Sequence, residues 1–255
     1  QVTSAGGRMS DADDTSRDEQ PEAEPEVAPS LTTHALGLHL RTGWVFRHVT
    51  LAAYPGDAIE IVGSGGTGRS MLLLALVGRA RHTAGELDVL GRHLPAGRAG
   101  ASVAREVRRR TAVAQVGPLV ELEGQQSVRQ AVAERGRWDR LRRREEQRVL
   151  AYDEAAALVG LSVPPDERVE ALAVVDRTLL AVALALGSPH EVLVVDDLDL
   201  GLGEAEHLRV AEALADVAAT GTVVVSAASR PSGSTRARTY DMPVHDAIHA
   251  AQEVR

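Results

Sequence analysis

The sequence predicts an α/β fold with a mixed core sheet, an antiparallel β subdomain and a helical subdomain. Three observations support this class. An apolar strand, a glycine-rich loop and an apolar helix follow one another in 58-AIEIVGSGGTGRSMLLLAL-76. Two apolar runs, within 191-EVLVVDDLDLG-201 and 221-GTVVVSAAS-229, flank a helical pattern. The segment before residue 63 alternates apolar and polar side chains, which is typical of antiparallel strands.

Residues 1–30 are expected to be a disordered acidic tail. Residues 10–30 hold eight carboxylates and one arginine, with several prolines and no apolar periodicity. Such a segment buries too little apolar surface to fold by itself. Because the tail carries most of the formal charge of −8, the rest of the chain is close to neutral and gives no argument for a nucleic-acid partner.

The β-rich half follows the tail. We expect strands over 35–40 and 45–63, the second interrupted by a turn at 55–57, where Pro, Gly and Asp stand together. A buried helix is predicted over 71–81. A hairpin should follow over 83–95.

Gly85 and Gly91 are expected at the turns of this hairpin, and a buried strand over 110–116 should come next. From about 125 to 186 the apolar period becomes helical, with a proline pair at 164–165 interrupting it. This stretch therefore contains the predicted helical subdomain, at about 125–180.

The last third should contain a crossover unit. Apolar strands within 191–201 and 221–229 are of the fully buried, parallel type, and the segment 203–220 between them has a helical pattern. Such a strand–helix–strand unit is right-handed. Residues 230–255 are expected to start as a loop and to finish as a weak helix.

The composition of the chain excludes several classes of protein and site. The chain has no cysteine, which excludes disulfides and thiolate metal sites. No apolar run reaches the roughly 18 residues that a membrane-spanning helix needs, and no segment resembles a signal peptide. All 28 basic residues are arginine, so an arginine at position 69 is part of a chain-wide absence of lysine.

The segment 63-GSGGTGRS-70 has the residue types that hold a phosphate group. Its glycines let backbone N–H groups turn toward phosphate oxygens, and the helix that follows adds the positive end of its dipole. In the pattern G-x-x-x-x-G-K-[ST] a lysine stands where this chain has Arg69. A tight strand–helix turn without a ligand is the alternative interpretation. The predicted phosphate-binding residues are Gly63, Ser64, Gly65, Gly66, Thr67, Gly68, Arg69, Ser70 and Met71.

A carboxylate pair follows the strand 192-VLVV-195. A phosphate loop requires an acid at the end of a neighbouring apolar strand to hold Mg²⁺, together with the hydroxyl of Ser70. Asp196 is the predicted metal-side residue, and Asp197 stands next to it. The alternative is a strand that ends in solvated aspartates, but two such elements in this order favour a nucleotide site.

With these two elements the chain resembles the ATP-binding cassette (ABC) family, a family of P-loop NTPases. The resemblance extends to 83-TAGELDVLGRHLP-95, to Gln115 in AVAQVG and to 127-SVRQAVAE-134. It implies a nucleotide-binding domain over 31–230 with a helical subdomain at about 125–180, followed by a C-terminal tail over 231–255. It also implies ATP and Mg²⁺ as cofactors.

The resemblance further implies roles for individual residues. Asp197 would be the catalytic base, and Gln115, at the metal and catalytic site, would link that site to the membrane partner. Ser70 and Asp196 would hold Mg²⁺. The implied partners are an integral membrane transporter subunit and a second nucleotide-binding domain, in a homodimer or a heterodimer. The implied location is cytoplasmic, at the inner face of the cell membrane.

The sequence departs from the family at several functional positions. The signature LSGGQ is replaced by 172-LAVVD-176, and the catalytic glutamate by the shorter Asp197. This chain has Gly203 where the family has an aspartate and Ala227 where the family has a histidine. Near the position of the aromatic residue that stacks on adenine, it has only His39 and, slightly displaced, Trp44. The resemblance thus implies an ATP-binding transport subunit with weak or impaired hydrolysis. The alternative is a non-catalytic pseudo-ATPase that acts as a scaffold or regulator of a membrane protein.

An arginine-rich block and a histidine pair each allow two interpretations. The arginine-rich block 135–148 suits either anionic lipid headgroups or a solvated helix face. His245 and His249 stand at helical spacing, which suits either a metal or a surface pair without a ligand.

Overall fold

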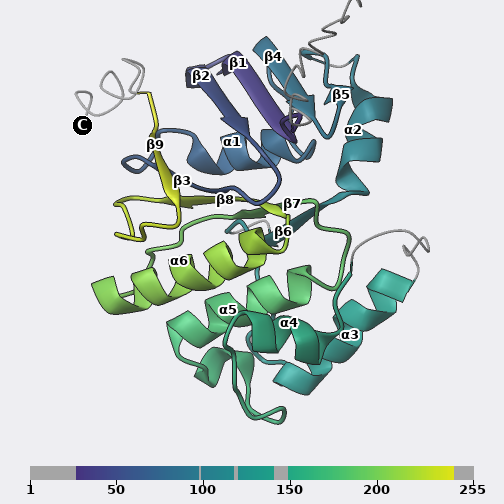
Figure 1. Cartoon of the computed structure of the whole chain (residues 1–255), viewed down its shortest axis with the longest axis vertical. Helices are drawn as coiled ribbons and strands as arrows, with labels where there is room; N and C mark the ends of the chain where they lie inside the picture. Colours follow the sequence, from purple (N-terminus) through teal and green to yellow (C-terminus); the bar gives the residue numbers. More distant parts are fainter. Residues whose placement is uncertain (1–26, 98, 118–119, 141–148, 244–255) are drawn as a thin grey trace, which may run out of the picture.

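The computed structural model describes residues 27–97, 99–117, 120–140 and 149–243, which form two sheets and six α-helices. Figure 1 shows helix α1 between the smaller sheet and the larger sheet, with α5 and α6 on the opposite side of the larger sheet. Most of the predicted acidic tail lies outside the described residues. The fold class is confirmed.

The smaller sheet is antiparallel throughout, in the order β2-β1-β4-β5. This confirms the predicted antiparallel strands and the hairpin, whose turn falls at Gly91. The strands are β1 (Leu31–Leu40), β2 (Gly43–Ala53), β4 (Ala84–Val89) and β5 (Arg92–His93).

The turn predicted at Gly85 is wrong, because Gly85 is the second residue of β4. Its φ is 77°, and a β-carbon on it would lie 2.4–2.5 Å from backbone atoms of His34 and Ala35. The register between β1 and β4 shifts just after His34. Close approach of two strands at an irregular pairing therefore requires this glycine.

The larger sheet is parallel, in the order β6-β7-β8-β3-β9. The antiparallel strands thus form a sheet of their own rather than joining this one. The parallel pairing of β7 and β8 around α6 confirms the predicted crossover unit. The strands are β3 (Ala58–Val62), β6 (Thr111–Gln115), β7 (Val192–Val195), β8 (Val223–Ala228) and β9 (Arg238–Asp241).

Strand β9 replaces part of the loop predicted after residue 230. Its four residues show no apolar alternation and are largely exposed, so local pattern does not reveal it. Its backbone pairs with β3 at the sheet edge, and the Thr50 N–H donates to the Tyr240 hydroxyl at 3.1 Å. Long-range pairing decides this strand. The weak helix predicted beyond it falls from residue 244 onward outside the described residues.

The helices also differ from expectation at two places. Helix α1 starts at Arg69 and ends at Leu76, short of residue 81, because the chain turns at Gly78 with φ 68°. Helix α2 was not predicted, since it is rich in arginine and Val107 is its buried residue. The helices are α1 (Arg69–Leu76), α2 (Ala101–Arg108), α3 (Val128–Arg140), α4 (Tyr152–Leu158), α5 (Val174–Ala185) and α6 (Glu204–Ala219), with a 3₁₀ turn at Val169–Ala171.

The core is divided by the larger sheet. Successive residues of β7 point to opposite faces, so Val192 and Val194 pack toward α1 while Leu193 and Val195 pack toward α5 and α6. Aliphatic side chains fill both halves. With both faces covered, the ends of β3, β6, β7 and β8 meet at one edge, where α/β sheets usually bind ligands. None of the described helices is long and apolar enough to cross a membrane.

Candidate functional site

The glycine loop over residues 63–68 joins β3 to α1 at this edge of the sheet. Its first residue is tied to β8, because the Gly63 N–H donates to the Ala228 carbonyl at 3.2 Å. The backbone N–H and the hydroxyl of Thr67 both donate to the Ser64 carbonyl, at 3.3 and 2.8 Å. The loop is therefore held by its own hydrogen bonds before any ligand arrives.

The end of the loop is clamped against the smaller sheet. Gly68 has φ 86°, and a β-carbon on it would lie 2.3 Å from the carbonyl oxygen of Val45 in β2. At Gly65, in contrast, an added β-carbon would meet nothing within 4 Å. The loop therefore has one glycine that packing requires and another that faces open space.

Arg69 turns its charge into the protein. Its guanidinium donates from Nη1 to the carbonyls of Gly63 and Ala228. The Nη2 atom lies 3.8 Å from Oδ1 of Asp197, and the Arg69 side chain is 11% exposed. The cation therefore joins the start of the loop to the ends of β7 and β8. The sequence indicated which residue stands here but not this orientation.

Asp196 is the buried acid of the site. It follows β7 directly, is fully buried, and accepts the N–H of Asp197 on Oδ1 at 2.9 Å. Burial raises its pKa, and the Ser70 hydroxyl that faces it offsets this only in part. Among the described residues, no well-formed hydrogen bond reaches its Oδ2 atom. A buried carboxylate oxygen of this kind beside a hydroxyl fits a cation that prefers oxygen ligands, such as Mg²⁺.

Gln115 and Asp197 lie next to this acid. Gln115 ends β6 beside Val195, and its carbonyl accepts the N–H of Asp196 at 2.9 Å. Asp197 adopts a left-handed backbone conformation with φ 50°, and its carboxylate faces Arg69. The structure thus brings together the glycine loop, Ser70, Gln115 and both aspartates, as the sequence predicts.

One polar pair at this edge was missed. Asp199 accepts hydrogen bonds from the hydroxyl of Ser229 and, at 2.9 Å, from its backbone N–H. Burial would raise the pKa of Asp199, but the Ser229 hydrogen bonds lower it below its ordinary value. The available signal was positional, because each residue follows one of two apolar strands that end at the same edge. The pair connects the segment after β7 to the end of β8.

The positions that depart from the family contribute no replacement groups. Ala227 is fully buried in β8 opposite Ile61, so a histidine there would have to enter the core. Gly203 stands before α6, where its N–H donates to the carboxylate of Glu206 at 3.0 Å. The rings of His39 and Trp44 pack edge to face with centroids 5.0 Å apart.

The start of α5 carries the segment 172–176. Ala173 precedes the helix and provides no side-chain hydrogen bond to it, and Val174 is its first residue. Asp176 lies in the first turn and pairs with Arg209 at 3.4 Å. A carboxylate in the first turn offsets the positive end of the helix dipole. This helix end is therefore poorly suited to an anion.

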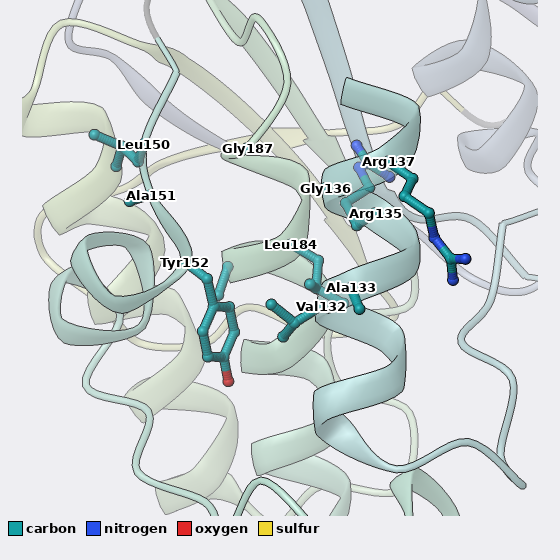
Figure 2. A pocket seen from close by; sticks show the side chains of 11 residues that line it. Val132, Ala133, Arg135, Gly136, Arg137, Leu150, Ala151, Tyr152, Leu184 and Gly187 are labelled. Carbon is teal, nitrogen blue, oxygen red and sulfur yellow. The ribbon is translucent and has the colours of Figure 1, made fainter. Parts of the chain in front are cut away.

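A cavity of about 730 Å³ lies in the helical region, away from the glycine loop. Figure 2 shows Tyr152 on one side of it and Val132 and Leu184 on the other. Arg135, at its border, donates to the Ser188 hydroxyl at 2.9 Å. Residues 141–148 of the predicted arginine block lie outside the described residues, so the lipid and solvent interpretations of that block stay open.

Within the described ranges, no group of three or more histidine, cysteine or acidic residues could hold a metal ion. His245 and His249 lie outside them. The Asp196 and Ser70 pair therefore needs ligand oxygens from elsewhere, such as phosphate and water, to complete a Mg²⁺ shell.

Comparison with known families identifies this arrangement. The family model described as "ABC transporter" matches residues 46–198, more than half of the chain. The chain belongs to the ABC transporter family. The matched region of this ABC chain begins in β2 and includes the glycine loop, Gln115 and both aspartates after β7.

Individual relatives agree. The chain is 30% identical over 183 residues to the ribose import ATP-binding protein RbsA 3 of Rubrobacter xylanophilus, covering 69% of this chain and 35% of the relative. It is 31% identical over 182 residues to the phosphonates import ATP-binding protein PhnC 2 of Pseudomonas savastanoi pv. phaseolicola. This match covers 66% of this chain and 64% of the relative. The matches therefore span less than two thirds of either relative.

A solved structure shows the same fold. The dimeric structure of MJ0796, a bacterial ABC transporter cassette, superposes on this ABC chain with a TM-score of 0.66 and 14% identity. The superposition covers 83% of this chain and 94% of that chain.

Proposed function

We propose that this chain is the ATP-binding subunit of a membrane transport or export complex, and that it binds Mg-ATP through a variant phosphate loop with weak hydrolysis. The observation that carries the proposal is the buried Oδ2 of Asp196, which no well-formed hydrogen bond from the described residues reaches and which lies beside Ser70 at the glycine loop. Such an atom is costly unless a cation or donor satisfies it.

Each part of the site has a role in this proposal. Arg69 and the backbone N–H groups of residues 65–70 would hold the phosphates, and Ser70 and Asp196 would hold Mg²⁺. When bound, Mg²⁺ neutralises charge on the β- and γ-phosphates. Gln115 would contact both the metal site and the membrane partner, and Asp197 would be positioned as the base.

The assembly is proposed from the relatives. Two of them are named import ATP-binding proteins, and the MJ0796 cassette is dimeric. These names support an integral membrane subunit as partner and a homodimer or heterodimer of nucleotide-binding domains. In that assembly the chain would lie in the cytoplasm at the inner face of the cell membrane.

Weak hydrolysis is proposed from the groups around Asp197. Its carboxylate is engaged by Arg69, and it is one methylene shorter than glutamate. No histidine stands at Ala227, and α5 begins with Val174 where the family has signature glycines. Loss of a single transition-state donor typically costs about 10²–10³ in rate.

Gly65→Asp should abolish Mg-ATP binding while leaving the fold intact. An added side chain at Gly65 meets no protein atom within 4 Å, yet its carboxylate would face the phosphates. Like-charge contact of this kind costs several kcal/mol, which corresponds to a loss of about 100-fold or more. Calorimetric titration of the purified wild-type and variant chains with Mg-ATP measures this loss of affinity.

Gly65→Ser is the matched control for size, and it should bind Mg-ATP like the wild-type chain. Wild-type chain that shows no binding at millimolar ATP would contradict the proposal. Equal binding by the aspartate and serine variants would place the nucleotide away from this loop.

The second candidate function is a non-catalytic pseudo-ATPase that acts as a scaffold or regulator of a membrane protein. It is favoured by the contacts of Arg69, whose guanidinium already satisfies Gly63, Ala228 and Asp197. A nucleotide would have to compete with these contacts, because hydrogen bonds to a charged group contribute about 1.5–3 kcal/mol each.

Arg69→Lys should strengthen Mg-ATP binding about tenfold or more without restoring turnover. A single ammonium cannot maintain the forked contacts of the guanidinium, so the cation becomes available to phosphate, and tenfold corresponds to about 1.4 kcal/mol. Turnover stays low because Ala227 and the start of α5 are unchanged. Calorimetry and phosphate release measure the two quantities, with Arg129→Lys in α3 as control. A large gain in turnover would show instead that Arg69 alone suppresses hydrolysis.

A further inference from the structure

A second cavity lies at the opposite end of α1 from the glycine loop. It has a volume of about 270 Å³ and is lined by residues 78–82, by Leu94, Pro95 and Gly97, and by one face of α2 from its start to Arg108. Helix α1 has eight residues, so the two ends are about 12 Å apart. None of residues 63–71 lines this cavity. It is therefore separate from the proposed nucleotide site.

The charged side chains that line this cavity are all arginines. Among its described lining residues there is no aspartate or glutamate, although the whole chain has a formal charge of −8. The nearby acid Glu106 pairs with Arg92 at 3.5 Å. The four arginines are Arg79, Arg81, Arg105 and Arg108.

Two of these arginines are anchored by the protein, and Nη1 of Arg79 donates to the Thr111 hydroxyl at 3.3 Å. Nη1 of Arg108 donates to the Gly78 carbonyl at 2.6 Å, which holds this side chain at the turn after α1. Arg81 and Arg105 are exposed. The cavity thus combines positioned cations with cations that are accessible to a ligand.

The start of α2 adds backbone donors. Gly100 and Ala101 line the cavity, and Gly100 provides no side-chain cap to the eight-residue helix. The first turn carries no acidic residue. The first N–H groups of a helix have no partner within it, and together with the helix dipole they favour an anion.

A buried histidine supplies an independent observation. His82 lines the cavity and is 2% exposed. In the described part of the chain its Nε2 atom has no hydrogen-bond partner. A buried nitrogen without a partner costs free energy, and an oxygen-rich ligand at this wall would satisfy it.

We propose that this cavity binds a phosphate group, either free inorganic phosphate or the headgroup phosphate of an anionic lipid. Arginine side chains, free helix N–H groups and a buried imidazole nitrogen converge on it, and each of them is a preferred partner of phosphate oxygens. The site is distinct from the glycine loop and does not depend on nucleotide binding there.

The first test is titration of the full chain with inorganic phosphate, followed by amide NMR. Shifts should appear at residues 82 and 101. They should need at least tenfold more phosphate in Arg81→Gln/Arg105→Gln, which removes two exposed cations. The control Arg129→Gln/Arg168→Gln removes the same charge from exposed positions in the helical region and should behave as wild type. Any shifts at residues 63–71 report the glycine loop separately.

The second test distinguishes the sources of phosphate. Flotation of the full chain with vesicles of phosphatidylcholine, alone or mixed with phosphatidylglycerol, measures headgroup binding. Binding to the mixed vesicles that Arg81→Gln/Arg105→Gln removes and the control keeps would assign a lipid headgroup. Amide shifts without such binding would assign free phosphate. If Arg81→Gln/Arg105→Gln and its control Arg129→Gln/Arg168→Gln behave alike in both experiments, the proposal is overturned.

Discussion

Replacing His207 by alanine should lower the free energy of unfolding by about 3–5 kcal/mol, because it leaves a buried carboxylate without its imidazole partner. Glu60 in β3 is 2% exposed and His207 in α6 is 1% exposed. Nε2 of His207 lies 3.1 Å from Oε1 of Glu60, although its N–H direction is not ideal for a hydrogen bond. The hydroxyl and N–H of Ser232 donate to the same carboxylate, at 2.9 and 3.0 Å.

The pH dependence follows from the same contacts. Burial alone would raise the pKa of Glu60, but His207 and Ser232 lower it by more, so the pKa lies below its ordinary value. A lowered pKa in the folded state gives stability that is present at neutral pH and lost as pH falls through that lowered pKa. The loss caused by His207→Ala should therefore shrink as pH falls through the lowered pKa of Glu60.

Urea unfolding of the wild-type chain, His207→Ala, Glu60→Gln and the double variant measures both expectations. The loss in the double variant should be smaller than the sum of the single losses, since the two residues interact directly. His34→Ala, at an exposed position in β1, should change stability by no more than about 0.5 kcal/mol. Additive losses for Glu60 and His207 would refute the coupling.

Gly68→Ala should be the most destabilising single substitution in the glycine loop, and it should lower the free energy of unfolding by about 3 kcal/mol or more. A left-handed conformation costs a residue with a β-carbon about 1–2 kcal/mol. The added β-carbon would also lie 2.3 Å from the Val45 carbonyl oxygen, so the loop or β2 must move. Because α1 begins at the next residue, this movement would displace Arg69 and Ser70.

Thermal or urea unfolding measures this loss. Gly65→Ala is the matched control, since its β-carbon meets no atom within 4 Å, and its loss should stay within about 1 kcal/mol. If the two alanine variants unfold alike, the loop is not clamped by β2 as described.

Local pattern was sufficient where an element carries a strong apolar period or special turn residues. The strand before Gly63, the crossover unit around α6 and the acids after β7 were all predicted at the right places. The prediction failed where pairing depends on distant residues. Strand β9 is largely exposed and forms by pairing with the edge strand β3. Helix α2 has one buried residue, so its sequence shows no apolar helical period.

The candidate site divides in the same way. Residue types and chain order predicted that the glycine loop and the acids after the apolar strand would meet, because such strands end at one edge of a sheet. The place of Gln115 beside them was implied by the resemblance to the ABC family. No local pattern indicates the direction of a long side chain. The contacts of Arg69 with Gly63, Ala228 and Asp197 join three separate strand ends, and they exist only in the folded chain.

By itself the sequence determined an α/β fold and where its glycine loop and acidic strand end lie, because apolar periodicity and glycine positions act over short distances; the ABC type of this fold came from the resemblance to that family. The tertiary structure alone decided that β2 clamps Gly68, that Arg69 turns inward and that Asp196 keeps an unsatisfied oxygen. It also decided that arginines from two separate segments line the same cavity as His82. Burial and hydrogen bonding between residues far apart in the chain set these features, since they depend on which surfaces meet when the two sheets pack around α1.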